Sequence, residues 1–458
     1  MMMLSQVAQT LHARLEGSDV RFSAVSTDTR SIAQGDLFVA LRGEHFDGAR
    51  FVVQAAQAGA VAAIVNEGSV LEGMSCPVLL VPDTRLALGK LAAYWRRQFD
   101  IPLLAITGSN GKTTVKEMLA AILRQQAGED AVLATRGNLN NDIGMPLTLL
   151  KLSAQHRYAV IEMGMNHPGE IEYLTHLAQP DVALINNASG AHLQGLGSVE
   201  GVARAKGEIF VGLKSNGTAV INADDAHAGL WRTLANKHRV FDFALEHTAA
   251  VKGEWQAQNF GGELRAFTPA GELRAVLQVP GEHNARNALA AATAALAVHV
   301  PLATIARALE GFGGVAGRLQ RKQALGGATL IDDTYNANPA SMHAALEVLA
   351  QAKGARIFVL GDMGELGDGA AQFHREIGIA ARELGIESLY ALGELSKQAV
   401  REFGEGAIHF TEIEELLAIL KNELDAQTTV LVKGSRFMKM ERVVQGCAAP
   451  QEETCCSH

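Results

Sequence analysis

Apolar strand-length segments alternate with helix-length segments between residues 103 and 314, and this alternation limits the fold more than any other feature of the chain. Three of the apolar segments end in polar residues: RYAVIEMG (157–164), DVALINNA (181–188) and GTAVINADD (217–225). Wholly apolar strands separated by helices indicate a parallel sheet that is covered on both faces. Because ligands of such folds bind beyond the carboxyl ends of the strands, chemistry is expected near Glu162 and Asn186.

The same alternation continues on both sides of this segment. The helices expected inside it cover residues 113–127, 168–178, 199–211 and 284–298. On its N-terminal side, strands are expected within 36–43, 55–67 and 76–83, followed by a helix over 84–99. The inner face of that helix is expected to consist of Leu86, Leu88, Leu91, Ala92 and Trp95. On its C-terminal side, strands are expected at 329–333, 356–362, 388–393 and 428–435.

These patterns predict an α/β protein with three domains. Residues 1–100 would form a small α/β domain, residues 101–314 a central domain with a mainly parallel sheet, and residues 315–458 a Rossmann-like α/β domain. A chain of 458 residues is long enough for two to four domains at about 100–200 residues each. A hydrophobic content of 48% excludes the collagen-like and disordered classes.

The net charge and the cysteine content exclude several classes of function. The net charge of −9 argues against non-specific binding of nucleic acid or of an anionic membrane. The four cysteines are too few and too unevenly spaced for a disulfide framework or a zinc site. The N-terminus has no signal-peptide pattern, and no run of about 18 apolar residues lacks a charge. We therefore expect a soluble, reduced, cytoplasmic protein.

The sharpest local signal is a buried strand that runs into a glycine-rich turn and then a helix, in LLAITGSNGKTTVKEML (103–119). Backbone N–H groups of such a loop, with the helix N-terminus, bind phosphates. Lys112 would reach the outer phosphates, and the Thr113 hydroxyl could bind Mg²⁺. The common phosphate-loop spacing places glycine where this chain has Ile106, so the loop is a variant, and a fortuitous glycine turn is the alternative. The expected nucleotide contacts are Thr107, Gly108, Ser109, Asn110, Gly111, Lys112, Thr113 and Thr114.

A second group of residues could hold metal ions beside this loop. Glu162 ends an apolar strand and is placed to hold Mg²⁺, with a surface carboxylate as the alternative. His192 lies in a glycine-rich loop, and Lys206 and Glu208 flank Gly207 on a predicted helix. Each of these residues alone is usually structural, but together they are candidates for a second metal site.

Further polar residues could close the site. Asn284 and Asn287 lie one helical turn apart, where amides could bind an adenine edge, and helix capping by Asn284 is the alternative. Arg318 at the junction of the second and third domains, with Asp332 and Asp333 at a strand end, could close over the nucleotide. In the third domain, the residues expected to face a cleft are Asp362, Glu365, Lys433 and Arg436.

Together these motifs resemble the ATP-dependent Mur ligases of bacterial cell-wall synthesis over nearly the whole chain. The sequence TGSNGKTT at 107–114 is similar to the phosphate loop of that family. The resemblance implies that Glu162 binds Mg²⁺, that His192 binds a second Mg²⁺, and that Lys206 is carbamylated by CO₂. The catalytic set that it implies is Lys112, Glu162, His192 and Lys206. The positions that match nucleotide contacts are Asn287 for adenine, and Arg318 and Asp333 from the C-terminal domain.

Other segments narrow the resemblance within the family. Residues 26–48 are similar to the uridine-binding domain shared by the third and fourth ligases, while 137–146, 332–342 and 361–367 are similar to the fourth. The D-N-P-R signature of the third ligase is absent. The substrate contacts implied are Asp28, Arg30, Asp47, Asn138, Asn140, Asn141, Asp362, Glu365, Lys433 and Arg436.

The resemblance implies a monomeric amide ligase that joins D-alanyl-D-alanine to UDP-N-acetylmuramoyl-tripeptide. It would use ATP, two Mg²⁺ ions and CO₂ held as a lysine carbamate. The γ-phosphoryl group would pass to the tripeptide carboxylate, and the dipeptide amine would attack the acyl phosphate. The alternatives are another ligase of this fold (the third Mur ligase or a folylpolyglutamate synthetase), a phosphate-loop ATPase that acts as a switch, and a non-catalytic nucleotide-binding scaffold.

Overall fold

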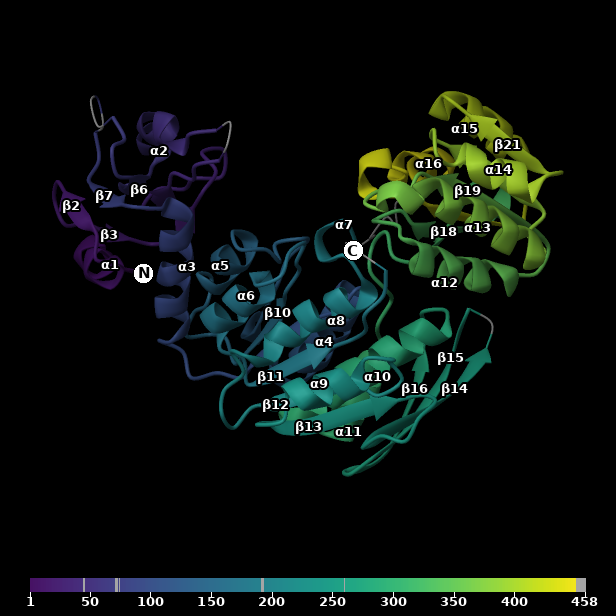
Figure 1. Cartoon of the computed structure of the whole chain (residues 1–458), viewed down its shortest axis with the longest axis horizontal. Helices are drawn as coiled ribbons and strands as arrows, with labels where there is room; N and C mark the ends of the chain where they lie inside the picture. Colours follow the sequence, from purple (N-terminus) through teal and green to yellow (C-terminus); the bar gives the residue numbers. More distant parts are fainter. Residues whose placement is uncertain (44–45, 71–72, 74, 191–192, 259, 450–458) are drawn as a thin grey trace, which may run out of the picture.

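A computed structural model describes residues 1–43, 46–70, 73, 75–190, 193–258 and 260–449. It contains three α/β units in a curved row, with the N-terminal and C-terminal units at the two ends of the central unit (Figure 1). Among the described residues each unit has its own main sheet, of five, nine and six strands in chain order, and the N-terminal unit has a second sheet of two strands. No helix within the described ranges is long and apolar enough to cross a membrane.

The N-terminal unit has the strand order β2-β7-β6-β5-β4, in which β2 alone runs antiparallel to its neighbour. The predicted strands and the helix–glycine–strand unit are confirmed, and Gly59 ends its helix at a φ of 120°. The elements are β1 (Met2–Met3), α1 (Leu4–Leu11), β2 (Arg14–Glu16), β3 (Arg21–Phe22), β4 (Val25–Ser26), β5 (Leu37–Val39), α2 (Val52–Ala58), β6 (Ala62–Asn66), β7 (Val78–Val81) and α3 (Thr84–Arg96).

Helix α3 joins the N-terminal unit to the central unit. The carboxylate of Asp83 caps it by accepting from the backbone N–H groups of Arg85 and Leu86, at 2.7 and 3.0 Å. As predicted, Leu88 and Leu91 are buried. The prediction that Leu86 belongs to the inner face is wrong, because its side chain is 50% exposed and borders the cavity described below.

The central sheet has the strand order β16-β15-β14-β13-β12-β11-β8-β10-β9. All pairs from β14 to β9 are parallel, which confirms a mainly parallel sheet. The expected strand–helix alternation fails between residues 239 and 277, because two antiparallel hairpins there connect strands without a helix. The strands are β8 (Leu103–Thr107), β9 (Val132–Ala134), β10 (Tyr158–Glu162), β11 (Val182–Ile185), β12 (Thr218–Asn222), β13 (Arg239–Ala244), β14 (Val251–Gln258), β15 (Gly261–Thr268) and β16 (Gly271–Leu277).

Helices cover both faces of the central sheet, as the apolar strands require. One apolar cluster packs against α4, α10 and α11, whereas the cluster on the other face continues through α3 and α1 into the N-terminal unit (Figure 1). The sheet of the N-terminal unit and the central sheet are therefore joined by one apolar core. The helices are α4 (Lys112–Ala127), α5 (Gly144–Leu149), α6 (Glu170–Ala178), α7 (Leu193–Leu196), α8 (Val199–Gly207), α9 (Ala228–Leu234), α10 (Glu282–Ala297) and α11 (Leu302–Glu310).

The C-terminal unit is a doubly covered sheet with the order β17-β18-β22-β19-β20-β21, parallel except for β17. Helices α12, α13 and α14 contribute to the apolar cluster of one face, and α15 and α16 to that of the other. The elements are β17 (Gln320–Gln323), β18 (Thr329–Asp333), α12 (Pro339–Ala350), β19 (Ala355–Gly361), α13 (Ala370–Glu383), β20 (Ser388–Leu392), α14 (Lys397–Phe403), β21 (Ala407–Phe410), α15 (Ile413–Asn422), β22 (Thr428–Lys433) and α16 (Glu441–Cys447).

The contact between α3 and α6 can be tested at Gly89, where an added Cβ would lie 2.0 Å from the Tyr173 hydroxyl oxygen. We expect Gly89→Ala to lower the free energy of unfolding by about 1–3 kcal/mol, measured by urea unfolding. Adding Tyr173→Phe should restore most of that loss. Gly229→Ala is the matched control, because its Cβ would meet nothing within 4 Å. Equal effects of the two glycine variants would contradict this packing.

Candidate active site

A cavity of about 1170 Å³ lies where the three units meet, and all three contribute to its walls. The N-terminal unit contributes Asp83, Arg85 and Leu86 from the start of α3. The central unit contributes the loop before α4, the end of β10 and the first turn of α10. The C-terminal unit contributes the loops after β18, β19 and β22. These loops lie at the carboxyl ends of parallel strands, where the sequence predicted ligand binding.

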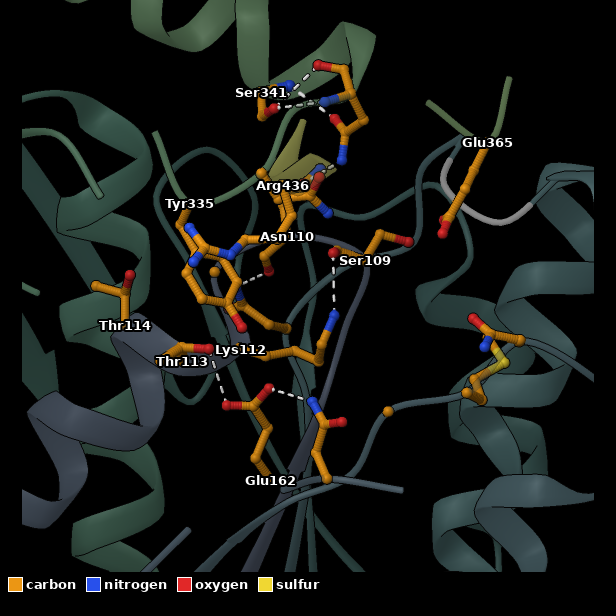
Figure 2. Close-up of a pocket in the computed structure, with 18 of the residues that line it drawn as sticks. Ser109, Asn110, Lys112, Thr113, Thr114, Glu162, Tyr335, Ser341, Glu365 and Arg436 are labelled. Carbon is orange, nitrogen blue, oxygen red and sulfur yellow. Dashed lines mark hydrogen bonds between the residues drawn. The ribbon is translucent and has the colours of Figure 1, made fainter. Parts of the chain in front are cut away.

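The predicted phosphate loop connects β8 to α4 and faces this cavity (Figure 2). Gly111 has a φ of 76°, which favours glycine. A Cβ at this position would also lie 2.4 Å from the Asn287 side-chain oxygen. Buried Thr107 donates to the Met163 carbonyl at 2.9 Å and so ties the end of β8 to the loop after β10.

Asn110 links this loop to the central sheet and to the C-terminal unit. Its backbone N–H donates to the Asn187 side-chain oxygen at 2.8 Å, and its carbonyl accepts from the amides of Asn186 and Asn187 at 3.0 and 3.1 Å. Its side-chain oxygen accepts from Asn338, the residue before α12, at 2.8 Å. The loop conformation therefore depends on contacts from two units.

The ammonium group of Lys112 lies above the loop and donates to the carbonyls of Gly108 and Ser109, at 2.6 and 3.1 Å. Burial lowers the pKa of Lys112, the nearby Glu162 carboxylate opposes that effect, and the charge of Arg318 adds to it. The side chain is thus a half-buried cation on the cavity wall, beside the loop that the sequence predicts to bind phosphate.

Glu162 occupies the end of β10, as predicted, and is buried rather than a surface carboxylate. One of its oxygens accepts from the Thr113 hydroxyl at 2.9 Å (Figure 2). The other accepts from the Asn140 amide at 2.8 Å. Arg318 donates to the same Thr113 hydroxyl at 2.9 Å from the C-terminal side. This cluster of oxygen ligands is the chemistry that Mg²⁺ prefers.

Lys206 is buried on α8, with 1% of its surface exposed. No hydrogen bond or ion pair joins it to another residue that the structure describes. Burial, reinforced by the charge of Lys112, holds the pKa of Lys206 well below its usual value. Its predicted partner His192 lies outside the described residues. Glu208 has a structural contact, since its carboxylate accepts from the backbone N–H groups of Gly169 and Glu172 at the start of α6.

Asn284 and Asn287 both line the cavity from α10. The Asn287 side-chain oxygen accepts from Asn186 at 2.8 Å, and its amide donates to Asn284 at 3.2 Å. Asn284 donates to the carbonyl of Pro280 at 2.8 Å, and the capping position of the helix is Gly281 instead. The two amides therefore stiffen the first turn of α10 while they border the cavity.

The two predicted carboxylates at the end of β18 point in different directions. Asp333 lines the cavity and forms a buried ion pair with Lys433, at 2.6 Å. Asp332 turns away, where it pairs with Lys322 at 2.6 Å and accepts from the Thr334 hydroxyl at 2.7 Å. Strand alternation explains this difference, because successive side chains of β18 point to opposite faces.

Among the predicted substrate residues of this unit, Glu365, Lys433 and Arg436 line the cavity, and Figure 2 shows Glu365 and Arg436 on its wall. Glu365 has a φ of 62°, which is unusual for a residue other than glycine. The expectation that Asp362 faces the cavity is wrong. Its carboxylate accepts from the backbone N–H groups of Leu395 and Ser396, at 3.1 and 2.7 Å, and so anchors the loop after β20.

The predicted uridine contacts lie in the N-terminal unit and outside the cavity wall. Asp28 and Arg30 form an exposed ion pair with each other at 2.6 Å, and hydrogen bonds from Arg30 lower the pKa of Asp28 to about 2. Asp47 accepts from the backbone N–H of Ala49 at 3.0 Å. Of the three asparagines predicted near residue 140, Asn140 and Asn141 line the cavity and Asn138 does not.

Sequence reasoning missed several residues of the cavity wall. Tyr335 stacks under Arg318, whose guanidinium carbon lies 4.2 Å from the ring centre. Asn338 contacts the phosphate loop, and Arg85 and Asp142 form an ion pair across two units. Tyr335 and Asn338 belong to the segment DDTYNANP, which also contains the predicted site residue Asp333. Their closeness to Asp333 in the sequence could have indicated that they line the cavity. Arg85 and Asp142 belong to no motif.

The ion pair of Lys433 and Asp333 yields a stability prediction. We expect Lys433→Met to lower the free energy of unfolding by about 3–5 kcal/mol, because it leaves a buried carboxylate unpaired. The double variant with Asp333→Asn should lose less. Lys397→Met, which breaks the exposed pair with Glu394, is the control and should cost about 1 kcal/mol or less in the same urea titration. A Lys433 variant as stable as the control would contradict the assignment.

Three family matches cover most of the chain. Residues 21–96 match the catalytic domain of the Mur ligase family, residues 106–295 match the Mur ligase middle domain, and residues 317–436 match the Mur ligase glutamate ligase domain. Their order follows the three units of the structure.

Curated and solved relatives agree with these matches. The chain is 44% identical to UDP-N-acetylmuramoyl-tripeptide–D-alanyl-D-alanine ligase of Escherichia coli (strain K12), over 99% of both chains. UDP-N-acetylmuramoylalanyl-D-glutamyl-2,6-diaminopimelate–D-alanyl-D-alanyl ligase from Acinetobacter baumannii is 37% identical, with a TM-score of 0.86 over 96% of this chain and 97% of that chain. MurF ligase from Thermotoga maritima in complex with ADP is 27% identical, with a TM-score of 0.82 over 92% and 96%. With this identity over its whole length, the chain belongs to the Mur ligase family.

Proposed function

We propose that this chain joins D-alanyl-D-alanine to UDP-N-acetylmuramoyl-tripeptide, with the conversion of ATP to ADP and phosphate. The observation that carries the proposal is the 44% identity, over 99% of both chains, to a ligase of that name. The cavity supports it, because a phosphate loop, a buried carboxylate and walls from all three units meet there. Another ligase of the same fold is disfavoured by this identity.

ATP is proposed to bind with its phosphates at residues 107–114. The Thermotoga maritima relative was solved in complex with ADP, which supports the use of an adenine nucleotide. The N–H groups of the loop and the Lys112 ammonium would bind phosphate oxygens, and Arg318 would reach them from the C-terminal unit. Asn287, with Asn284 beside it, is proposed to contact adenine from α10, and Asp333 the nucleotide from the end of β18.

The oxygen atoms around Thr113 fit Mg²⁺. Its hydroxyl already contacts the carboxylate of Glu162, so the two residues would hold the ion together with phosphate oxygens. No three His, Cys, Asp or Glu side chains gather anywhere in the described ranges, at this site or another, so the phosphate oxygens would have to supply much of the coordination. Bound Mg²⁺ supplies positive charge that neutralises the phosphates and polarises the γ-phosphoryl group.

Lys206 is proposed to carry a carbamate. Burial without a described partner favours the neutral amine form of Lys206, and the neutral amine is the form that attacks CO₂. The product is an anion, which would suit a second Mg²⁺ held together with His192. The plain alternative is a cationic lysine that binds phosphate directly.

In the proposed reaction, a carboxylate oxygen of the tripeptide attacks the γ-phosphorus of ATP, and ADP leaves with the bond electrons. The amine of D-alanyl-D-alanine then attacks the acyl phosphate carbon, loses a proton and expels inorganic phosphate. Lys112 stabilises the charge of the transferring group, and the C-terminal unit excludes water from the acyl phosphate.

Each unit is proposed to hold the main part of one substrate. Residues 1–100 would hold the uridine nucleotide through Asp28, Arg30 and Asp47, while residues 101–314 would hold ATP. Residues 315–458 would bind the dipeptide through Glu365, Lys433 and Arg436. Asn140 and Asn141 would contact the tripeptide beside Glu162, whereas Asn138, which lies outside the cavity wall, would not. We propose that the enzyme acts as a monomer in the cytoplasm, where ATP is available.

Phosphate release tests this function. The purified full-length chain should release phosphate at a high rate only with ATP, UDP-N-acetylmuramoyl-tripeptide and D-alanyl-D-alanine together, with an amide product detected by mass spectrometry. Lys112→Ala should lower the rate about 10²–10³-fold without unfolding the chain, since it removes the charge nearest the phosphoryl group. Phosphate release that does not depend on either peptide substrate would instead favour an ATPase switch, and no release would favour a binding scaffold.

The carbamate at Lys206 is tested by mutation and rescue. Lys206→Ala should be nearly inactive, and acetate should restore part of the activity because it supplies the missing carboxylate. Lys206→Arg keeps a positive charge and should stay inactive. ¹³C NMR of the wild-type chain in ¹³C-bicarbonate should show a carbamate carbon that Lys206→Ala lacks. An active arginine variant would establish the cationic alternative.

A further inference from the structure

Arg85 presents a partly used guanidinium to the cavity from the first turn of α3. Its Nε and Nη2 groups donate to the two carboxylate oxygens of Asp142, in the loop before α5. A guanidinium has five N–H donors, and no other hydrogen bond joins this side chain to a residue within the described ranges. The side chain is 53% exposed. Arg85 is therefore held in one orientation with three donors left for a ligand.

Within the described part of the N-terminal unit, Arg85 is the positively charged residue on the cavity wall. The other lysines and arginines on the wall also have partners. Lys112 contacts loop carbonyls, Arg318 contacts Thr113, and Lys433 pairs with Asp333. Arg286 pairs with Glu246 and Glu282, and Arg436 pairs with Glu441. One turn after Arg85, α3 packs so closely against Tyr173 that there is no room for a side chain at position 89.

We propose that Arg85 binds a carboxylate of the tripeptide that does not react. This inference rests on the proposed function. The D-glutamyl-2,6-diaminopimelate peptide named for the Acinetobacter baumannii enzyme has more than one carboxylate, whereas one carboxylate alone receives the phosphoryl group. Paired N–H groups of arginine match a carboxylate in shape and charge. A carboxylate held at Arg85 is kept away from Lys112, which leaves the terminal carboxylate to meet the γ-phosphate.

A structural alternative uses the same contacts. Arg85 would then serve only to tie α3 to the loop of Asp142, and any change in activity would follow from a loosened contact between the two units. The two accounts differ at Asp142, because its replacement breaks the tie while it leaves the guanidinium in the cavity. They also differ in how the effect depends on the carboxylates of the substrate.

The first test compares variants in the phosphate-release assay with the full chain. Arg85→Ala should raise KM for UDP-N-acetylmuramoyl-tripeptide about tenfold to a hundredfold, and leave KM for ATP and D-alanyl-D-alanine within about twofold. Asp142→Asn should raise KM for the tripeptide substrate much less than Arg85→Ala does, because the guanidinium stays in the cavity although it is held less firmly. Arg14→Ala, which breaks the exposed pair with Glu16 in the same unit, is the control and should change no KM. Equal KM increases in the Arg85 and Asp142 variants would overturn the proposal in favour of the structural tie.

The second test removes carboxylates from the substrate one at a time. One analogue carries D-isoglutamine in place of D-glutamate, and the other carries lysine in place of 2,6-diaminopimelate. One of the two analogues lacks the carboxylate that Arg85 is proposed to bind. With that analogue, the wild-type enzyme should already have the raised KM, and Arg85→Ala should not increase this KM further. An Arg85→Ala effect of the same size with both analogues would overturn the proposal. If wild type forms no amide with the natural substrates, the proposed function itself fails, independently of Arg85.

Discussion

The hydrogen bonds of Asn110 are the constraint on which the geometry of the cavity depends. Asn110 is bound by the asparagines that follow β11 and by Asn338 before α12, so the phosphate loop cannot move independently of the central sheet or of the C-terminal unit. Asn186 extends this network to α10 through Asn287. These buried and part-buried contacts support one another as a network, and they hold the loop, α10 and the C-terminal unit in one arrangement.

Much of this arrangement was predictable from sequence, because it depends on patterns that are local in the chain. Strand β18 has the predicted bounds, and Glu162 and Asn186 lie at strand ends because wholly apolar runs define those strands. The loop from Gly108 to Lys112 was predictable because its glycines and the start of the following helix are visible in the sequence itself. A glycine at position 111 is needed both for its positive φ and for the space beside Asn287.

The parts that were not predicted depend on partners far away in the sequence. Arg85 and Asp142 are 57 residues apart, and Asp362 is held by backbone groups 33 and 34 residues later, so no local motif indicated either contact. Leu86 has the spacing of a core residue, but its turn of α3 borders the cavity. The hairpins of β14 to β16 add antiparallel strands to a parallel sheet, and only the pairing between strands reveals this.

Lys206 connects these observations to the proposed chemistry. A buried ammonium without a counter-ion costs several kcal/mol, and the charge of Lys112 raises that cost further. A neutral amine removes the repulsion, and a carbamate would convert it to attraction. Under the proposed carbamate, an anion at Lys206 would favour the charged form of Lys112, whose own pKa is lowered by burial. The modification would then serve the phosphate loop as well as the metal, because it would keep a cation beside the transferring phosphoryl group.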